Sequence, residues 1–555
     1  MFKRLLFLLA IAGSALAQSR PAADLIVTNA KIWTVDQAHP SAQAVAVLGD
    51  RIVAVGSNSE VDLWRGPRAQ VIDAHGRLLL PGFNDAHVHF ISGGAALEQI
   101  DLKSTTTKQE FIKKVAEYVA RTPKGEWLLG GNWDDQQLTP VELPTKDWID
   151  AVSPATPVFL YRYDGHMSLA NSLALKLAGI TRESKDPPGG VIVRDSNGEP
   201  TGLLKDAAQD SVYNHVVPPM THDQRLRAAR NALQHAASLG VTSVQDMNPA
   251  DADIAVYSEL AEKGELTTRI YVAPLETEVQ DWAKLGLRHS FGSPYLRVGA
   301  LKGYADGSLG SSTAAMFAPF ADDSHNSGLL SDEMQPLEGM RARLTKADAA
   351  GLQICIHAIG DRGISMTLDL FQDVVKANGA RDRRFRIEHS QHMAAKDFDR
   401  YAKLGVIASM QPYHAIDDGR WAEKRLGPER IKRTYAFRTF LDHGVHLAFG
   451  TDWTVAPLDP MQGLYAAVTR ATLDGKNPNG WLPEQKLTIQ EAIAAYTSGS
   501  AYAEFQEKEK GTISAGKLAD MVLLDRDILT IPANETKNAK VRLTVVGGKV
   551  VYRAQ

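Results

Sequence analysis

Cysteine is almost absent from this 555-residue chain, in which Cys355 is the only one. A single cysteine cannot form an internal disulfide bond, so the stability of the fold must come from its hydrophobic core. Cys355 lies in the apolar, strand-like run LQICIHAIGD, which indicates a buried structural thiol rather than a nucleophile. With 44% hydrophobic and 23% charged residues, the composition is typical of a globular protein, and the length exceeds what one core needs.

A concentration of positive charge is also missing. The formal net charge is −4 at pH 7, and it becomes −6 if the two N-terminal cations, Lys3 and Arg4, are removed. A mildly acidic chain without a basic stripe is a poor binder of nucleic acid, so a small molecule is the expected partner.

The apolar run LLFLLAIA near the N-terminus is too short to span a bilayer as a helix. It follows Lys3 and Arg4, and an A-x-A cleavage site ending at Ala17 comes after it. These features predict a secretory signal peptide over residues 1–17, and hence an exported protein that is periplasmic or secreted. No cysteine stands at the cleavage point, so neither a lipid anchor nor membrane association after cleavage is expected.

Two histidines two residues apart, His87 and His89, are the most informative feature of the chain. They end the segment LLLPGFNDAHVHF, which begins with an apolar run. Residues two apart in a β-strand point to the same face, so both imidazoles can bind one metal ion, as in catalytic zinc sites. An H-x-H pair alone is common and also fits surface histidines, so the rest of the chain must decide.

Both ends of the chain have the alternating pattern of short β-strands. It covers residues 23–76 and returns in the C-terminal segment, where Gly547-Gly548 is a hairpin signal. Neither piece is long enough to make a stable sheet alone. We therefore expect residues 18–80 and 508–555 to form one small composite β-sandwich domain.

Between these ends, candidate strands alternate with amphipathic helical stretches. Counting the strand that carries His87 there are eight, which predicts an α/β fold with a (β/α)8 TIM-type barrel over residues 81–507. The segment of about residues 95–220 is too long for an ordinary loop, so we expect a lobe inserted after the first strand. The other seven predicted strands cover residues 241–247, 269–274, 297–307, 352–361, 384–391, 406–414 and 445–453.

Active sites of such barrels lie at the carboxyl ends of the strands, and polar residues end four of the predicted strands. Singly, such a histidine is more often a packing residue, a lysine is usually solvated, and an aspartate after Gly-Thr is usually a turn or cap residue. Together with the H-x-H pair, their convergence on one mouth predicts a metal site. The four residues are Lys302, His357, His389 and Asp452.

With these residues in this order, the sequence resembles the amidohydrolase superfamily. The flanking motifs PGFNDAHVH, HAIGDRG, RIEHSQ and GTDW agree, as does the tail GTISAGKLADMVLLD. It is more closely similar to the branch that contains the YtcJ-like proteins and N-substituted formamide deformylase (amidohydrolase family 3). The segments that carry this resemblance are KGYADGSLGSSTA at 302–314, YRYDGHMSLANS at 161–172 and GEPTGLLKDAA at 198–208.

The resemblance implies two divalent metal ions, with zinc as the first expectation and manganese, iron or cobalt compatible with the same ligand types. Lys302 is implied to carry a carboxyl group derived from CO2 that bridges the ions, because an unmodified cationic lysine would repel them. Asp306, four residues on, is the alternative to Lys302. The other implied ligands are His87, His89 and Asp452 for one ion, and His357 and His389 for the other.

The resemblance also implies a hydrolase of C–N bonds other than peptide bonds. A metal-bound hydroxide would attack an amide, formamide or N-acyl compound, and Asp452 would pass its proton to the leaving nitrogen. The family favours a homodimer.

Several further residues are candidates for the substrate pocket. For Asp361 a helix N-cap is an equal alternative, and for the aromatic residues core packing is the stronger expectation. Asp85 belongs to the first motif and is expected to stabilise the loop or support the metal ligands. The candidates are His166, Asn171, Trp133, Asp361, Tyr413 and Trp453.

Other functions stay open on the same site. Many deaminases of the superfamily carry a glutamate three residues after the strand-five histidine, where this chain has Gly360, so release of ammonia from a heterocycle is the weaker alternative. Hydrolysis of a lactone or carbamate is also compatible. A non-catalytic scaffold protein would be expected to have lost ligands, whereas this chain retains all six.

Overall fold

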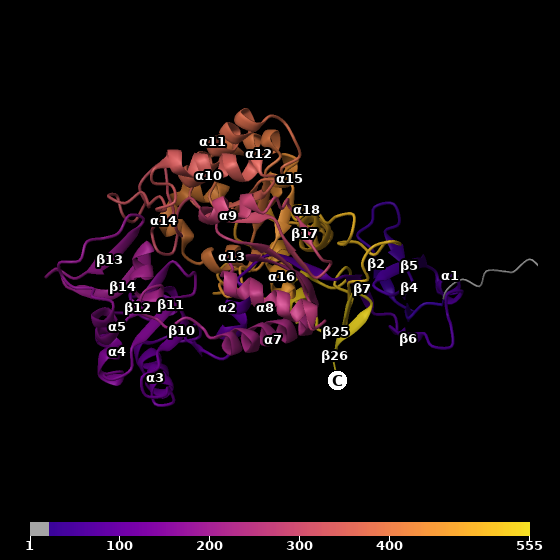
Figure 1. Ribbon diagram of the computed structural model, residues 1–555, viewed down its shortest axis with the longest axis horizontal. Coiled ribbons are helices and arrows are strands. Elements are labelled where there is room, and N and C mark those ends of the chain that lie inside the picture. Colours follow the sequence, from indigo (N-terminus) through magenta and orange to yellow (C-terminus); the bar gives the residue numbers. More distant parts are fainter. Residues whose placement is uncertain (1–21, 555) are drawn as a thin grey trace, which may run out of the picture.

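The computed structural model describes residues 22–554, so the predicted signal peptide at residues 1–17 lies outside the described residues. Helices and strands alternate through the middle of the chain, which confirms the α/β class (Figure 1). Within the described part, no helix has both the length and the apolar character needed to cross a membrane.

The first parallel sheet carries the H-x-H motif. Its strands are β8 (Phe83–Val88), β15 (Val241–Met247), β16 (Arg269–Ala273) and β18 (Leu296–Val298), with the short antiparallel β17 (Phe291–Gly292) at the edge. Every residue of β8, β15 and β16 is buried. Such complete burial is expected for parallel strands that are covered on both faces.

The second parallel sheet contains the later candidate strands. These are β19 (Ala300–Tyr304), β20 (Gln353–Ala358), β21 (Arg386–His389), β22 (Ile407–Met410) and β23 (Leu447–Phe449), in chain order across the sheet. Two isolated parallel bridges join the two sheets, one between Leu275 and Lys302 and one between Val88 and Trp453.

The predicted strand over 297–307 is wrong in one respect, because it is two strands in different sheets. Gly299 separates β18 from β19 and has φ 122°, a conformation that favours glycine. The apolar pattern runs through both strands, so it gives no sign of the break.

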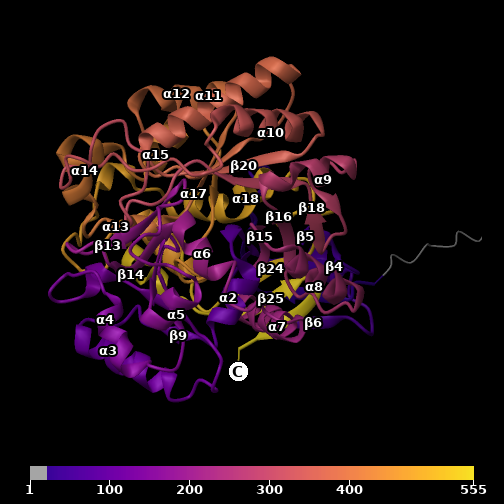
Figure 2. The same ribbon diagram turned by 60° about the vertical axis from the view of Figure 1, so that its left-hand side comes forward.

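Helices cover the parallel strands on opposite sides in Figure 2, with α10, α11 and α12 on one side and α7 and α8 on the other. The principal helices are α2 (Phe90–Ala96), α7 (His222–Ser238), α8 (Asp251–Glu262), α10 (Leu337–Ala349), α11 (Asp361–Asn378), α12 (Phe398–Leu404), α13 (Pro412–Asp418) and α16 (Pro460–Thr469).

The two ends of the chain meet in one six-stranded sheet of order β26-β25-β24-β7-β2-β3, in which β2 is Lys31–Trp33 and β3 is Ser41–Ala42. In it β7 (Leu78–Pro81) pairs antiparallel with β24 (Met521–Leu524). As Gly547-Gly548 predicts, these two glycines connect β25 (Val541–Val546) to β26 (Lys549–Arg553), and both have positive φ. The indigo and yellow ribbons at the right of Figure 1 follow this arrangement.

A four-stranded sheet of order β5-β4-β1-β6 packs against these strands. It contains β1 (Leu25–Thr28), β4 (Ala44–Leu48), β5 (Arg51–Gly56) and β6 (Gln70–Asp73). Residues from both ends of the chain share its core, including Val45 and Met521.

The segment after β8 forms a separate six-stranded sheet of order β13-β14-β12-β11-β10-β9, seen in violet at the left of Figure 1. We call residues 100–206 the lobe. Its inner strands are β10 (Leu128–Trp133), β11 (Val158–Arg162), β12 (Met167–Ala170) and β14 (Pro200–Asp206), and its edge strands are β9 (Ile100–Asp101) and β13 (Gly190–Arg194). The helix α3 (Lys108–Val119) and the lobe's own buried side chains complete it.

Candidate metal centre

His87 and His89 both face one carboxylate. His87 is the penultimate residue of β8, and His89 stands at the N-terminus of α2. Their Nε2 atoms lie 3.6 and 3.4 Å from Oδ1 of Asp452. The His87 side chain is fully buried, whereas His89 retains 32% of its side-chain exposure. The two histidines therefore present ligand atoms to one point, as their spacing predicts.

Asp452 is held at this point by the backbone. It follows β23 with φ 59°, and its N–H donates to the His87 carbonyl at 2.7 Å. Burial alone would raise the pKa of Asp452, but the neighbouring His87 and the hydrogen bond from His89 outweigh burial and hold the pKa well below its usual range. The carboxylate is therefore ionised, as a metal ligand must be.

The remaining three predicted ligands lie in the same place. The His389 ring is 4.8 Å from the His87 ring and 4.5 Å from the His357 ring, measured between centroids. Nζ of Lys302 lies 3.5 Å from Nε2 of His87. Residues more than 300 positions apart in the chain thus share one cluster.

The electrostatics of this cluster suit a cation. Burial, reinforced by neighbouring cationic groups, lowers the pKa of His87, His357 and His389 well below the ordinary histidine value, so their imidazoles are neutral. Burial also lowers the pKa of Lys302. Neutral imidazoles and an ionised carboxylate are the donor types that zinc prefers. One ligand atom each from His87, His389 and Asp452 lie within 4.8 Å of one another, so the residues present fit a divalent ion.

Glu388 is a functional residue that the sequence reasoning missed. Its Oε2 accepts a hydrogen bond from Nδ1 of His87 at 2.7 Å, and its Oε1 accepts one from Nε of Arg386 at 2.8 Å. All three side chains are buried. The signal was present in RFRIEHSQ, because charged residues two apart in an apolar strand predict a buried ion pair on one face.

Two further residues position the histidines. Oε1 of Gln411 accepts a hydrogen bond from Nδ1 of His389 at 2.9 Å. Asp85 accepts hydrogen bonds from the backbone of His87 and from both the backbone and the hydroxyl of Thr451. Asp85 therefore ties the end of β8 to the loop that carries Asp452.

Asp306, the alternative to Lys302, supports the loop after β20. Its carboxylate accepts backbone N–H groups of Ala315, Ile359 and Gly360. Burial raises its pKa to about 7 despite these hydrogen bonds. Its Oδ1 lies 3.7 Å from Nε2 of His357. With its oxygens occupied in this way, Asp306 is placed to hold His357 rather than to replace Lys302.

The lobe contributes His166 to the site. The His166 ring is 5.0 Å from the His357 ring, and its Nδ1 donates to Oδ1 of Asp206 at 2.7 Å. Burial alone would lower the pKa of His166, but the hydrogen bond and charge of Asp206 raise it. His166 is the candidate pocket residue that the structure brings to the metal ligands.

Two other candidate pocket residues have structural roles inside the lobe. Trp133 is buried in the core of the lobe and donates to the Leu160 carbonyl. Asn171 caps the short helix α5 (Ser172–Leu177) through the backbone of Ala174. The placement of Trp133 and Asn171 in the pocket is thus corrected, because their polar atoms are used inside the lobe.

The other three, Trp453, Asp361 and Tyr413, belong to the part of the chain that also carries the later predicted ligands. Trp453 packs against Phe90 and His235, and its carbonyl accepts the N–H of His89. Asp361 is the first residue of α11 and accepts the backbone N–H of Phe317. Tyr413 lies on α13, with Nζ of Lys103 5.6 Å from its ring centroid.

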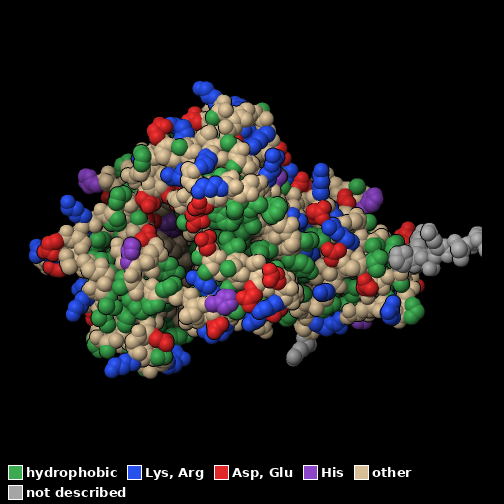
Figure 3. Space-filling model, in the orientation of Figure 1, with side chains coloured by type: hydrophobic (Ala, Val, Ile, Leu, Met, Phe, Trp, Pro, Cys, Tyr) green, Lys and Arg blue, Asp and Glu red, His purple; other side chains and the backbone are tan. Residues whose placement is uncertain are grey.

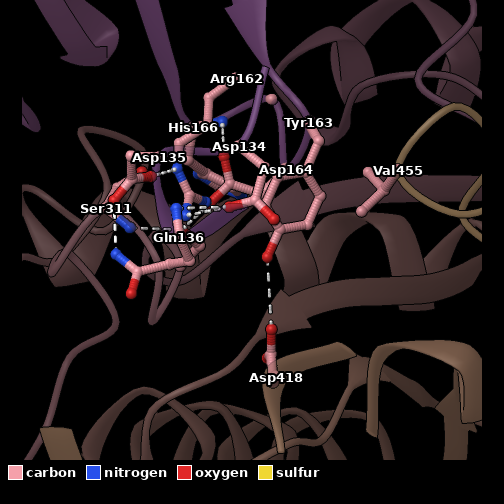
Figure 4. A network of polar contacts seen from close by, with 12 residues as sticks. Asp134, Asp135, Gln136, Arg162, Tyr163, Asp164, His166, Ser311, Asp418 and Val455 are labelled. Atoms are coloured by element: carbon pink, nitrogen blue, oxygen red, sulfur yellow. Dashed lines mark hydrogen bonds and ion pairs between the residues drawn. The ribbon is translucent and has the colours of Figure 1, made fainter. Parts of the chain in front are cut away.

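A network of buried ion pairs and hydrogen bonds holds the lobe against the rest of the protein (Figure 4). Arg162 of β11 pairs with Asp135 at 2.8 Å and Asp164 at 2.6 Å, and its side chain is fully buried. The next residue, Tyr163, lies 3.4 Å from Oδ1 of Asp418, at the end of α13. The network thus connects the lobe to the loops of the second parallel sheet.

Comparison with known proteins identifies the family. The pattern of the Amidohydrolase family matches residues 70–552, and the chain belongs to this family. It is 38% identical over 547 residues to Protein LONG AFTER FAR-RED 3 of Arabidopsis thaliana, covering 96% of this chain and 92% of that protein.

The branch expected from the sequence is also confirmed. The chain is 31% identical to the putative amidohydrolase YtcJ of Bacillus subtilis, over 94% of this chain and 98% of YtcJ. It is 28% identical to N-substituted formamide deformylase of Arthrobacter pascens, over 95% of this chain and 98% of that enzyme. Among solved structures, an uncharacterized metal-dependent hydrolase from Pyrococcus horikoshii OT3 has a TM-score of 0.74 at 28% identity, covering 92% of this chain and 99% of that one.

Proposed function

We propose that the protein is a metal-dependent hydrolase that cleaves a C–N bond in a small amide, formamide or N-acyl amine. The convergence of His87, His89 and His389 on the ionised Asp452 carries this proposal, because imidazole nitrogens beside a buried carboxylate form a cation site. The metal-dependent hydrolase from Pyrococcus horikoshii OT3, which the chain resembles over most of its length, supports it.

The fold supports a site at one mouth. We propose that the two parallel sheets close into a (β/α)8 barrel, with the bridges Leu275–Lys302 and Val88–Trp453 as the closing contacts. The sheets formed by both chain ends would be the composite β-sandwich domain, and residues 100–206 the inserted lobe. In such a barrel the carboxyl ends of the strands share one mouth, where catalytic residues gather.

Two ions, with zinc as the first expectation, are proposed for this mouth. Two ions close together supply a polarised carbonyl and a water molecule of lowered pKa. Burial lowers the pKa of Lys302, which favours the neutral amine that reacts with CO2, and its carbamate would supply bridging oxygens. The ligand sets would be His87, His89 and Asp452 on one side, and His357 and His389 on the other.

Asp452, Glu388 and the lobe have separate roles in the proposed reaction. Asp452 stands where it can accept a proton and return it to the leaving nitrogen, which an amine needs to depart. Glu388 fixes His87 with its Nε2 toward the cluster. The lobe covers one side of the site, and the Tyr163 hydroxyl holds it there by donating to Oδ1 of Asp418. This cover limits the access of water.

The proposal of C–N cleavage draws on the similarity to N-substituted formamide deformylase. The structure gives a reason to rank deamination second. A side chain at Gly360 would collide with the carbonyl of Ala315, so a proton-shuttling glutamate cannot stand at this position. Lactone or carbamate hydrolysis uses the same donors and stays an alternative.

Product analysis by mass spectrometry tests the proposal. Metal-loaded mature protein is incubated with N-formyl, N-acetyl and N-aroyl amines, N-acyl amino acids and amino-heterocycles. Release of an amine together with a carboxylic acid is expected, and a chelator should abolish it. Release of ammonia from a heterocycle, with the amides untouched, would overturn the proposal in favour of deamination.

We also propose that the protein is exported, supported by the signal-like segment at residues 1–17. N-terminal sequencing of the protein from its producing cells should find a start close after Ala17. A cytoplasmic protein that retains residues 1–17 would contradict export without touching the proposed reaction.

A further inference from the structure

A cavity of about 550 Å³ lies beside the metal centre, and we propose that it binds a cationic group on the amine part of the substrate. The substrate would thus be the amide of a diamine or of another amine with a second positive charge. This inference rests on the proposed function and adds the class of amine to it. Figure 3 shows a hollow between the lobe and the main body, with acidic side chains beside it.

The cavity adjoins the metal ligands directly. Its wall includes Tyr304, whose ring centroid is 4.7 Å from Nζ of Lys302 and 5.4 Å from the His357 ring. His166 lines this cavity and also a small one of about 40 Å³ that reaches His357 and Asp452. A molecule in the large cavity can therefore extend past His166 to the reacting position.

The small cavity limits the acyl part of the substrate. Its volume of about 40 Å³ is less than a tenth of the volume of the large cavity, about 550 Å³. A small acyl group, such as formyl or acetyl, is therefore the part of the substrate that we expect in this space. The remainder of the substrate must then occupy the large cavity, which is of the size typical of ligand pockets.

The large cavity is acidic. Five carboxylates line it, and among the described residues no lysine or arginine does. The nearby Lys205 donates to the Ser311 carbonyl, and Arg343 pairs with Glu276 and donates to the backbone carbonyl of Glu333, so both cations already have partners. The five are Asp206, Asp210, Asp306, Asp332 and Glu333.

One of these carboxylates keeps an oxygen without a partner. Oδ1 of Asp206 is bound by His166, whereas the buried Oδ2 has no hydrogen-bond partner among the described residues. Asp206 also has φ 46° and ψ −127°, a strained conformation for a residue other than glycine. Buried polar atoms are nearly always paired, so the free oxygen indicates an acceptor for a ligand donor.

Glu333 lies close to other carboxylates. Burial and the neighbouring Glu276 raise its pKa to about 8. Burial and the charge of Asp332 also raise the pKa of Asp210. Mutual repulsion of this kind is relieved when a cation enters.

Aromatic rings complete the wall with surfaces suited to an ammonium group and its carbon chain. Phe159, Tyr161, Tyr213 and Tyr304 line the cavity. Cations bind over such faces, and the effect strengthens where water is excluded. An anionic substrate, such as an N-acyl amino acid with a free carboxylate, would meet like charges and is expected to be excluded.

Matched amides test this inference. Monoacyl cadaverine carries a cation, N-acylhexylamine is a neutral analogue of similar length, and N-acylaminohexanoate is anionic, each as the formyl and the acetyl compound. The metal-loaded protein should hydrolyse the cationic amide with kcat/KM at least about tenfold above the neutral one, and the anionic one least.

Binding without turnover gives a second readout. Monoacyl cadaverine is titrated calorimetrically into metal-free protein, using the parent and the double variant Asp210→Asn/Asp332→Asn. Loss of two carboxylates at the cavity should weaken binding about fivefold to tenfold. The control Asp281→Asn removes an exposed charge on α9 (Val279–Lys284), outside the cavity lining, and should leave binding unchanged.

The outcomes separate the two proposals. If the neutral amide is cleaved as well as the cationic one, and the double variant binds like the parent, the cation site is overturned and the proposed function stands. If cationic amides bind through Asp210 and Asp332 but none is cleaved, the proposed function fails and the cation site stands.

Discussion

Nδ1 of His87 lies 2.7 Å from Oε2 of Glu388, and both side chains are buried. A carboxylate can only accept, so the imidazole must donate at Nδ1 and keep the lone pair of Nε2 toward Asp452. Partners of this kind fix the tautomer and the orientation of metal-binding histidines. The metal centre therefore depends on a residue that does not itself face the ions.

We predict that Glu388→Gln weakens metal binding about 10-fold to 100-fold, because the amide orients His87 less firmly. Metal content after dialysis should fall, and excess metal should restore part of the activity. The matched control is Glu98→Gln, which removes an exposed pair with Arg227 and should retain the parent's metal content. A Glu388→Gln protein with full metal and full activity would contradict this role.

Asp452→Asn should lower kcat by about 10²-fold to 10⁴-fold, since the amide cannot carry the proton from water to the leaving nitrogen. Steady-state kinetics with a good amide substrate measures this loss. An anilide with a low-basicity amine should be less affected than an alkylamide, because its departure needs less proton transfer. Equal losses for both substrates would argue that Asp452 acts in metal binding alone.

Arg162→Met should destabilise the protein by about 3–5 kcal/mol, because it leaves Asp135 and Asp164 buried without their cation. Urea denaturation measures the free energy of unfolding. Arg65→Met, which removes an exposed pair with Asp62, should change it by no more than about 0.5 kcal/mol. Similar values for the two variants would show that the buried network does not hold the lobe.

Asp418 gives a pH-dependent contribution to stability. Burial raises its pKa to about 7, against an ordinary value near 3.8, so the folded state binds more protons than the unfolded state between these values. Stability from this group is therefore lost as the pH rises from about 4 to 7.

Asp418→Asn removes this titration and keeps a hydrogen-bond acceptor for Tyr435. The free energy of unfolding of the variant minus that of the parent should be about 1–4 kcal/mol larger at pH 8 than at pH 5. Urea denaturation at both pH values measures this difference. A constant difference between the two proteins across this range would show that Asp418 titrates normally.

The sequence was sufficient to place the six candidate ligands together because strand periodicity and strand ends are local features. His357 and His389 lie at or next to the ends of buried strands, as their apolar runs predict. The separation of β18 from β19 could not be predicted, since a conformation at Gly299 rather than a change of pattern sets it.

Contacts between residues far apart in the chain could not be predicted from the sequence. The hydrogen bond from His87 to Glu388 joins residues 301 positions apart. The hydrogen bond from His166 to Asp206 depends on how the strands of the lobe pair. The prediction for Trp133 was wrong for a related reason. Composition does not distinguish a tryptophan that lines a pocket from one that fills a core, and Trp133 fills the core of the lobe.

The most direct test counts metal ions per chain and activity together, in the parent and in Lys302→Ala, during stepwise metal addition to metal-free protein. The account predicts no amide hydrolysis without metal and full activity at two ions per chain in the parent. In Lys302→Ala it predicts fewer ions and little activity. A Lys302→Ala protein with two ions and full activity would contradict the carboxylated lysine, and hydrolysis by metal-free parent protein would contradict the metal centre itself.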